Sequence, residues 1–253
     1  MNTVERVSTY DSQSAAYHRA FEVFLAHTDQ KAKARDWLGG FVHGLPSREV
    51  FVDAGAGNGK VTAWFLADFQ RTIAIEPNRS LCDELRRTCP TAEVLLQKIL
   101  EVQLSVLADL VLCSHVLYYI AAADWMAHLE KLVSWLAPEG ALVVVVQNHD
   151  TDCMRMLGHF FGQRFHLSEL ASRFEALWGR HYRVEIATVP AQVTTADFDS
   201  AFTVAEFMLN LLPMPHPPPR RILEEYVRSH FASPGGGFRF SCDQGFLTIR
   251  PRL

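Results

Sequence analysis

The stretch Asp53-Ala-Gly55-Ala-Gly57-Asn58-Gly59 decides the predicted fold because of what flanks it. Residues 49–53 form a short apolar run typical of a strand, and residues 60–69 have a pattern that favours a helix. Glycines between a strand and a helix let the backbone approach a bound group, and a helix N-terminus attracts negative charge. The stretch therefore predicts a ligand-binding loop after the first strand of an α/β fold.

The spacing of the glycines distinguishes between three kinds of nucleotide-binding loop. A P-loop requires GxxxxGK followed by Ser or Thr, whereas Gly59-Lys60 is preceded at the required position by Ala54 and followed by Val61. A dinucleotide fingerprint requires GxGxxG, and its third glycine falls on Lys60. The remaining pattern is D-x-G-x-G-x-G, in which Asp53 is a candidate partner for an ammonium group, directly or through water.

Strand and helix patterns alternate through the rest of the first 150 residues. Further strands are expected at 71–75, 93–96, 107–113 and 142–146, with helices at 80–88 and 124–136, the second of which is stopped by Pro138-Glu-Gly140. The continuous apolar character of 107–113 suits a strand covered on both faces. Five strands joined by helices predict right-handed crossovers and a parallel, doubly wound sheet.

The two ends of the chain predict additions to this sheet. Residues 1–45 are expected to form a helical lid, in which Tyr17, Phe21, Phe24 and Leu25 make one apolar stripe. Later elements are expected as a helix at 168–177, a strand at 182–193, a helical insertion at 196–232 and a strand at 240–249. We therefore predict one domain over 1–253, with a cofactor-binding core at 48–150. Its α/β, Rossmann-like sheet is expected to have seven mostly parallel strands and an antiparallel C-terminal edge.

The composition excludes several classes of protein. Hydrophobic residues make up 49% and charged residues 21% of the 253 positions, as in a globular protein with a full core. The formal charge is −4 and the basic residues are scattered, which argues against nucleic acid as a partner. No signal core or membrane-spanning stretch is evident, so we expect a soluble protein without a membrane partner. Five cysteines without paired spacing indicate reduced thiols in the cytoplasm, and the oligomeric state is not readable, although a monomer fits.

Polar residues after the later strands complete a cofactor signature. Glu76-Pro77 ends the second strand 17 residues beyond Gly59, where a carboxylate accepts hydrogen bonds from both hydroxyls of a ribose. Gln97-Lys98-Ile99 follows the third strand, and Ser114-His115 follows the fourth. With the glycine loop, this set resembles the motifs of class I methyltransferases. The resemblance implies S-adenosylmethionine as the cofactor, with Gln97-Lys98-Ile99 as the expected adenine contact, and methyl transfer as the reaction.

A closer resemblance, at low identity, extends over the whole chain. Tyr17 to Gln30 (YHRAFEVFLAHTDQ), His115-Val-Leu-Tyr-Tyr-Ile120, Ala205-Glu-Phe207-Met and residues 240–249 resemble segments of the histamine N-methyltransferase family. The first resembles that family's lid and the third its substrate-side insertion. The resemblance implies contacts to a small methyl acceptor from Tyr17, Phe21, Gln30, Tyr118, Tyr119, Phe207, Cys242 and Asp243.

The chain departs from that family where the acceptor is bound. The lid glutamate that holds the imidazole of histamine in the family corresponds to Gln30 here, and a glutamine after the fourth strand corresponds to His115. An asparagine near the C-terminus corresponds to Cys242 or Asp243. We therefore expect the cofactor side to be retained and the acceptor to be another small nitrogen compound.

Methyl transfer from a sulfonium needs an in-line nucleophile and the exclusion of water, with no metal. His115 is expected either to orient the acceptor and take its proton or to be a structural histidine, and Tyr119 and Tyr17 are the other candidate catalytic residues. One of the paired tyrosines is expected to be in the core. Two rival functions stay open. One is a metal-dependent O-methyltransferase using residues 147–150, and the other is a protein that binds the cofactor without catalysis.

Overall fold

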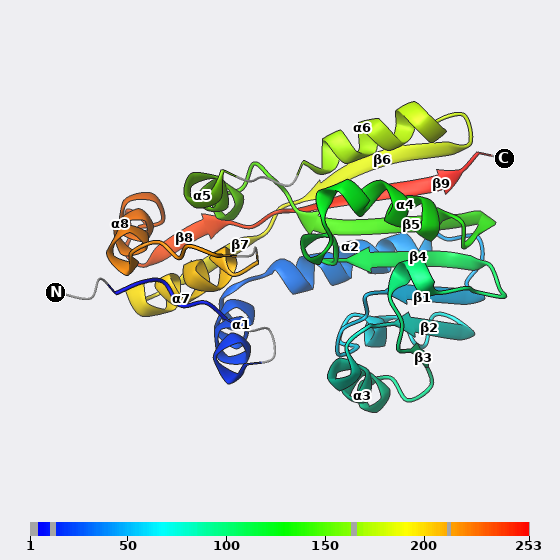
Figure 1. Ribbon diagram of the computed structural model, residues 1–253, viewed down its shortest axis with the longest axis horizontal. Helices are drawn as coiled ribbons and strands as arrows, with labels where there is room; N and C mark the ends of the chain where they lie inside the picture. The colour runs from blue at the N-terminus through cyan, green and yellow to red at the C-terminus, as the bar shows by residue number, and fades with distance from the viewer. Residues whose placement is uncertain (1–4, 11–13, 163–165, 212–213, 253) are drawn as a thin grey trace. The chain divides into compact units, whose positions relative to one another are not determined.

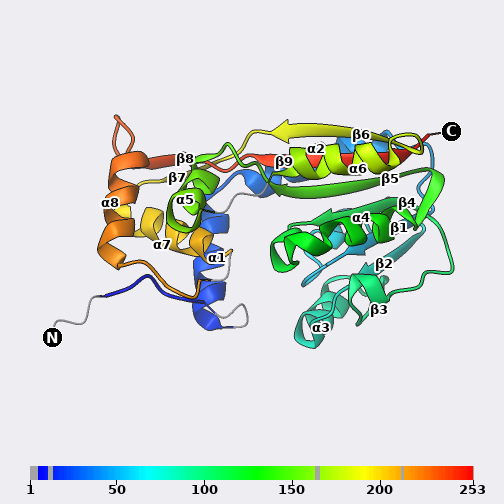
Figure 2. The same cartoon turned by 45° about the horizontal axis from the view of Figure 1, so that its top comes forward.

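The computed structural model describes residues 5–10, 14–162, 166–211 and 214–252 (Figures 1 and 2). The chain forms two compact units, each built from separate segments. Unit 1 contains Met1–Ala34, Gln147–Phe165 and Val189–Gln244, and unit 2 contains Arg35–Val146, His166–Thr188 and Gly245–Leu253. The predicted lid and insertion thus contribute mainly to unit 1, and the predicted core to unit 2. That the 253 residues act as a single domain stays a prediction.

Unit 2 is built on a seven-stranded sheet in the order β3-β2-β1-β4-β5-β9-β6. Pairing is parallel from β3 through β5, and β9 runs against its neighbours (Figure 1). The predicted α/β fold, with a mostly parallel sheet and an antiparallel strand at its C-terminal end, is confirmed. The strands are β1 (Val50–Ala54), β2 (Arg71–Ile75), β3 (Glu93–Leu95), β4 (Ala108–Ser114), β5 (Leu136–Gln147), β6 (Tyr182–Val189) and β9 (Gln244–Pro251).

The core of unit 2 lies on the central strands, whose apolar runs are buried on both faces. Leu110, Val111 and Leu112 in β4 have no exposed surface, as expected from the continuous pattern at 107–113. The one carboxylate in that run, Asp109, is nearly buried, and its Oδ2 accepts hydrogen bonds from the N–H groups of Glu49 (2.7 Å) and Val50 (2.8 Å). Asp109 therefore joins the starts of β4 and β1.

Helices flank the sheet of unit 2. They are α2 (Gln30–His43), α3 (Arg79–Thr88), α4 (Trp125–Val133) and α6 (Leu167–Trp178), with 3₁₀ turns η1 (Thr62–Trp64), η2 (Ile99–Glu101), η3 (Leu117–Tyr119) and η4 (Ala122–Asp124). The Asn78 side chain caps α3 by accepting a hydrogen bond from the Ser80 N–H (2.9 Å). None of the helices in the described residues is long and apolar enough to cross a membrane.

The predicted helix at 60–69 is wrong. Only η1 forms there, because the main chain closes tight three-residue turns such as Trp64 N–H to Val61 C=O (3.0 Å) and Asp68 N–H to Phe65 C=O (3.0 Å). The segment is rich in β-branched and aromatic side chains, which lose rotamer freedom in a helix. Its apolar spacing instead places Phe65 and Phe69 against Phe51 of β1, at ring-centroid distances of 6.0 and 5.3 Å.

Three further boundaries differ from the sequence-based expectations. The predicted strand at 142–146 begins six residues early, because Pro138-Glu-Gly140 forms a bulge inside β5 between the paired residues Leu136 and Ala141, while α4 ends at Val133. The predicted strand at 182–193 is interrupted after Val189, at Pro190, and the one at 240–249 is interrupted at Cys242 and Asp243. Each of these two predicted strands is thus divided into one strand of the seven-stranded sheet and one strand of the two-stranded sheet in unit 1.

The described residues of unit 1 form four helices beside a two-stranded antiparallel sheet. The sheet pairs β7 (Gln192–Thr195) with β8 (Phe238–Ser241). The helices are α1 (Ala15–His27), α5 (Asp152–Phe161), α7 (Phe198–Leu209) and α8 (Arg220–His230). The sequence patterns did not predict α5. The expectation of helix throughout 1–45 is wrong for the described residues before Ser14, which are extended because Val7 donates to the Pro218 carbonyl (3.0 Å).

Candidate functional site

The candidate cofactor residues gather at the carboxyl ends of β1, β2 and β4 in unit 2. In the sheet, β1 lies between β2 and β4, and all three run parallel. The chain order reverses between β1 and β4, since β2 and β3 lie on one side and β4 and β5 on the other. Ligands of doubly wound sheets bind at this reversal, outside the strand ends. The glycine loop, Glu76 and His115 all follow these three strands.

The glycine loop uses its glycines for two different purposes. A Cβ atom on Gly55 (φ +88°) would lie 2.3 Å from Cγ2 of Val116, so this glycine allows the loop to pack on the segment after β4. A Cβ atom on Gly57 (φ +57°) would meet no atom within 4 Å. Gly57 is therefore the position at which the loop leaves its backbone open to another molecule. Asn58 beside it is partly buried.

Glu76 connects the glycine loop to the segment after β2. One carboxylate oxygen accepts a hydrogen bond from the Gly57 N–H (3.0 Å), and the other accepts one from the Asn78 N–H (2.9 Å). The side chain is 7% exposed. An ionised carboxylate has about four acceptor sites, so these two bonds leave capacity for hydroxyl donors.

Asp53 is the second-last residue of β1, directly before the loop, and is almost fully buried. Its Oδ2 accepts a hydrogen bond from the Thr62 hydroxyl (2.6 Å), which ties the strand to η1. Burial, followed by the Asp53 charge, raises the pKa of the neighbouring Cys113 thiol to about 12. Sequence reasoning missed Thr62, since only the fold brings its hydroxyl to the carboxylate. Contact of Asp53 with an ammonium group stays a prediction.

His115 follows β4 in a backbone conformation that non-glycine residues rarely adopt (φ +59°). The conformation is held by a hydrogen bond from the His115 N–H to the Val145 carbonyl (2.8 Å), and Nδ1 lies 3.4 Å from the Tyr118 hydroxyl. Unfavourable backbone conformations persist where surrounding structure imposes them, and they are concentrated at functional sites.

The two tyrosines after His115 diverge, as expected for neighbouring side chains on a turn. Tyr118 is 6% exposed and Tyr119 is 67% exposed, so the prediction that one of them is in the core is confirmed. The turn is pinned by the Trp125 indole, whose N–H reaches the carbonyls of Leu117 (3.1 Å) and Ile120 (2.9 Å). The sequence did not predict this role of Trp125, because its position in an amphipathic helix pattern indicates only packing.

The remaining cofactor candidates lie at the same strand ends. Gln97 and Lys98 are exposed after β3, whereas Ile99 is buried at the start of η2. Pro77 is exposed beside Glu76, and Ser114 is the last residue of β4, where it pairs with β5. Their contacts with adenine or ribose stay predictions.

The aromatic candidates of the predicted lid and insertion form one cluster in unit 1. Phe207 of α7 is 3% exposed, and its ring lies 5.4 Å from that of Tyr17 and 5.5 Å from that of Phe21, both on α1. Phe24 stacks on the same ring at 5.5 Å. The cluster holds α1 against α7, and a role in contacting an acceptor stays a prediction.

Gln30, Cys242 and Asp243 are brought together, but their polar groups bond to the protein. The buried Gln30 amide donates to the Cys242 carbonyl (2.8 Å), and Asp243 Oδ1 accepts from the Ala191 N–H (3.0 Å). The Asp243 carbonyl accepts from the Asn148 N–H (2.8 Å). These bonds join three segments of unit 1, so the structure explains the residues without a substrate, and contact with one stays a prediction.

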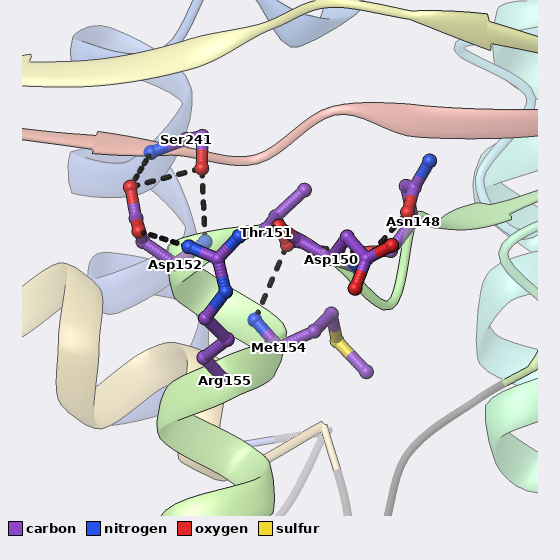
Figure 3. A network of polar contacts seen from close by, with 7 residues as sticks. All are labelled: Asn148, Asp150, Thr151, Asp152, Met154, Arg155 and Ser241. Carbon is purple, nitrogen blue, oxygen red and sulfur yellow. Dashed lines mark hydrogen bonds and ion pairs between the residues drawn. The ribbon is translucent and has the colours of Figure 1, made fainter.

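The residues considered for a metal, 147–150, lead into α5 (Figure 3). The Asn148 side chain accepts from the Asp150 N–H (2.9 Å), and Asp152 accepts from the N–H (2.8 Å) and hydroxyl (2.9 Å) of Ser241. In the part of the chain that the structure describes, no group of three or more His, Cys, Asp or Glu side chains is placed to hold a metal ion. The polar groups of this segment position α5 instead.

Comparison with known proteins agrees with this arrangement. Residues 51–140, which carry the strand ends described above, match a family model. That family is the methyltransferase domain. The domain implies S-adenosylmethionine as its cofactor. No curated protein matches the chain by sequence.

Solved structures resemble the chain more widely, at low identity. A protein from Bacillus halodurans C-125 that was assigned as a methyltransferase is 12% identical, with a TM-score of 0.62 over 85% of this chain and 97% of that one. The YcgJ protein from Bacillus subtilis is 13% identical, with a TM-score of 0.61 over 85% and 98%. DhpI, in a complex with SAH, is 17% identical, with a TM-score of 0.54 over 93% of both chains. At these identities the likeness establishes the fold. The closer resemblance to the histamine N-methyltransferase family stays a prediction.

Proposed function

We propose that this protein transfers a methyl group from S-adenosylmethionine to a nitrogen atom of a small amine or heteroaromatic acceptor. The observation that carries the proposal is the gathering of the open glycine loop, the Glu76 carboxylate and His115 at three adjacent strand ends of unit 2. The five cysteines are all free and buried, which supports a reducing compartment, the cytoplasm.

The residues present fit the cofactor. Gly57 offers an unobstructed backbone, and Glu76 retains acceptor capacity for the hydroxyls of a ribose. The proposed cofactor residues are Asp53, Gly55, Gly57, Asn58, Gly59, Glu76, Pro77, Gln97, Lys98, Ile99, Ser114 and His115. When bound, S-adenosylmethionine supplies an electrophilic methyl group on a sulfonium.

His115 is the proposed base for the acceptor. An aliphatic amine with a pKa of roughly 10 must lose a proton before its lone pair can form the new bond, and an imidazole is suited to take it. The proposal requires the tautomer in which His115 Nδ1–H donates to the Tyr118 hydroxyl oxygen at 3.4 Å, because only then is Nε2 the nitrogen that can accept a proton. Tyr119, Tyr17 and Phe21 are kept as proposed contacts of the acceptor, each to be tested by its own substitution.

Cofactor binding is tested by calorimetry with S-adenosylhomocysteine. We expect saturable binding to the wild type, lost in Asp53→Ala and in Glu76→Ala. Glu93→Ala is the matched control, because Glu93 pairs with Arg71 at the opposite end of the same strands and is exposed. Absence of heat with the wild-type protein would refute the proposal.

The acceptor is tested with a panel of azoles, aromatic amines, heterocycles and phenols, followed by mass spectrometry. A gain of one methyl mass on nitrogen compounds supports the proposal, and a gain on phenols alone assigns an O-methyltransferase. Activity that survives EDTA removes the metal-dependent rival. Binding without turnover on any acceptor assigns a cofactor-binding protein. His115→Gln is expected to lower turnover more for aliphatic amines than for azoles, which are already largely neutral.

A further inference from the structure

The outermost strand of the large sheet, β6, has an open edge. Within the described residues β6 pairs on one side only, with β9, and Figure 2 shows it as the last strand of the sheet. Four of its eight residues are exposed, and among them the apolar Ile186 is 44% exposed. An edge of this kind presents unpaired N–H and C=O groups that template pairing with another strand.

The main-chain groups of even-numbered residues face this open edge. The Arg252 N–H donates to the His181 carbonyl (2.7 Å). The main-chain N–H and C=O groups of the odd-numbered residues therefore point toward β9. In antiparallel pairs the direction alternates along the strand, so Val184 and Ile186 direct their main-chain groups outward, while the Tyr182 carbonyl at the start of the strand accepts a hydrogen bond from the Arg252 side chain (3.2 Å). The Tyr182 ring packs at 5.7 Å from Phe174 on α6, which places the even side chains on the α6 face.

The order of side chains along β6 is complementary to itself. The sequence Tyr182-Arg-Val-Glu-Ile186 has an apolar residue, a cation, a central valine, an anion and an apolar residue. Antiparallel pairing of two copies about Val184 places Arg183 of each opposite Glu185 of the other. Centring the pair on Arg183 or on Glu185 instead places like charges opposite each other, which is destabilising. Charge therefore selects one register.

We propose that a second copy of this chain pairs with β6, in antiparallel register about Val184, to make a two-fold symmetric dimer with a continuous sheet. Arg183 and Glu185 contact each other within the strand and are 65% and 51% exposed, so both charges are available to a partner. They occupy the closely spaced type of antiparallel pair, with Cα atoms about 4.5 Å apart. An open groove of about 560 Å³ between β6 and the α2 residues Trp37 and Phe41 flanks the contact.

Charge reversal tests the register. By size-exclusion chromatography with light scattering, the wild type is expected to be a dimer, and Arg183→Glu or Glu185→Arg is expected to raise its dissociation constant at least about tenfold. The double exchange R183E/E185R restores opposite charges and is expected to restore the dimer. The exchange R221E/E225R reverses a comparable exposed pair on α8 and serves as the control.

Disulfide cross-linking tests the same register without changing any charged residue. In the proposed dimer Val184 faces Val184 of the second copy, at a Cα separation of about 5.5 Å that a disulfide spans. Val184→Cys is expected to form a covalent dimer on mild oxidation, whereas Thr188→Cys, far from its own copy, is not. The native cysteines are buried and do not compete. A monomeric wild type, or a dimer unchanged by the single charge reversals, would overturn the proposal.

Discussion

The two glycines at the loop, Gly55 and Gly57, have opposite surroundings although both have positive φ. Gly55 lies against Val116, and Gly57 faces open space. Alanine at Gly55 combines backbone strain with a clash and is expected to lower the free energy of unfolding by more than about 2 kcal/mol. Alanine at Gly57 carries only the strain, about 1 kcal/mol.

Cofactor binding is expected to follow the reverse order. A methyl group on Gly57 occupies the space that the proposed ligand needs, so G57A is expected to raise the dissociation constant of S-adenosylhomocysteine at least about tenfold. Urea unfolding and calorimetry on both variants measure the two quantities. If G57A bound the ligand as tightly as the wild type, Gly57 would not be a point of close approach.

The buried thiols of Cys113 and Cys242 make stability depend on alkaline pH. Burial raises the pKa of each to about 12, above the value of about 8.5 for a free thiol. Because the unfolded thiol ionises first, the stabilising contribution is complete below about pH 8.5 and is lost as pH rises toward 12. We expect a slope of up to about 1.4 kcal/mol per pH unit for each thiol.

Denaturant unfolding between pH 7.5 and 10 measures this slope. Cys113→Ala is expected to flatten the decline, whatever its effect on stability at neutral pH. An equally steep decline in that variant would assign the pH dependence to other groups.

At the scale of elements, the extended segment 5–10 is fastened to α7 by a buried carboxylate. Glu206 is 6% exposed and accepts hydrogen bonds from the Ser8 N–H (2.7 Å) and the Tyr10 hydroxyl (2.6 Å). Burial and this bond raise the Tyr10 pKa far above its ordinary value. Tyr10→Phe removes one donor from a buried charge and is expected to cost about 1–3 kcal/mol.

Hydrogen exchange locates that cost. In Tyr10→Phe we expect faster exchange at Ser8 and Tyr10, whose N–H groups bond to Glu206 and Asn210. Tyr119→Phe removes a hydroxyl from an exposed side chain and is the control, with a change within about 0.5 kcal/mol. Unchanged exchange at Ser8 would show that the segment is held by other contacts.

The elements that sequence patterns predicted well are those determined by local burial. Strands β1, β2 and β4 are short apolar runs, and their boundaries agree to within a residue. The helix predicted at 60–69 was wrong because the apolar residues there, such as Phe65 and Phe69, are spaced to pack on β1. The predicted helix end and strand start around Pro138-Glu-Gly140 were wrong because residues that stop a helix also fit a bulge within a strand.

At the scale of the whole molecule, sequence patterns predicted that the residues at the strand ends of unit 2 meet, but did not predict the long-range contacts of unit 1. The loop and Glu76 follow consecutive strands, so parallel topology alone brings them together. Gln30 and Cys242 are separated by 212 residues, and Tyr10 and Glu206 by 196. Nothing local in the chain indicates that these groups bond to one another, so the sequence does not predict the contacts that hold unit 1 together. Unit 1 depends on such distant contacts throughout.

The proposed ligand is expected to protect one end of one sheet. With saturating S-adenosylhomocysteine, hydrogen exchange should slow at residues 53–59, 74–78 and 114–118, which are the carboxyl ends of β1, β2 and β4. Residues 182–188 are the internal comparison, because β6 is separated from β4 by β5 and β9 in the same sheet. At a hundredfold excess over the dissociation constant, global stability should rise by about 2.7 kcal/mol. Protection centred on β6 would place the ligand in the groove beside Trp37, whereas protection at the three strand ends ties the glycine loop, Glu76 and His115 to one bound molecule.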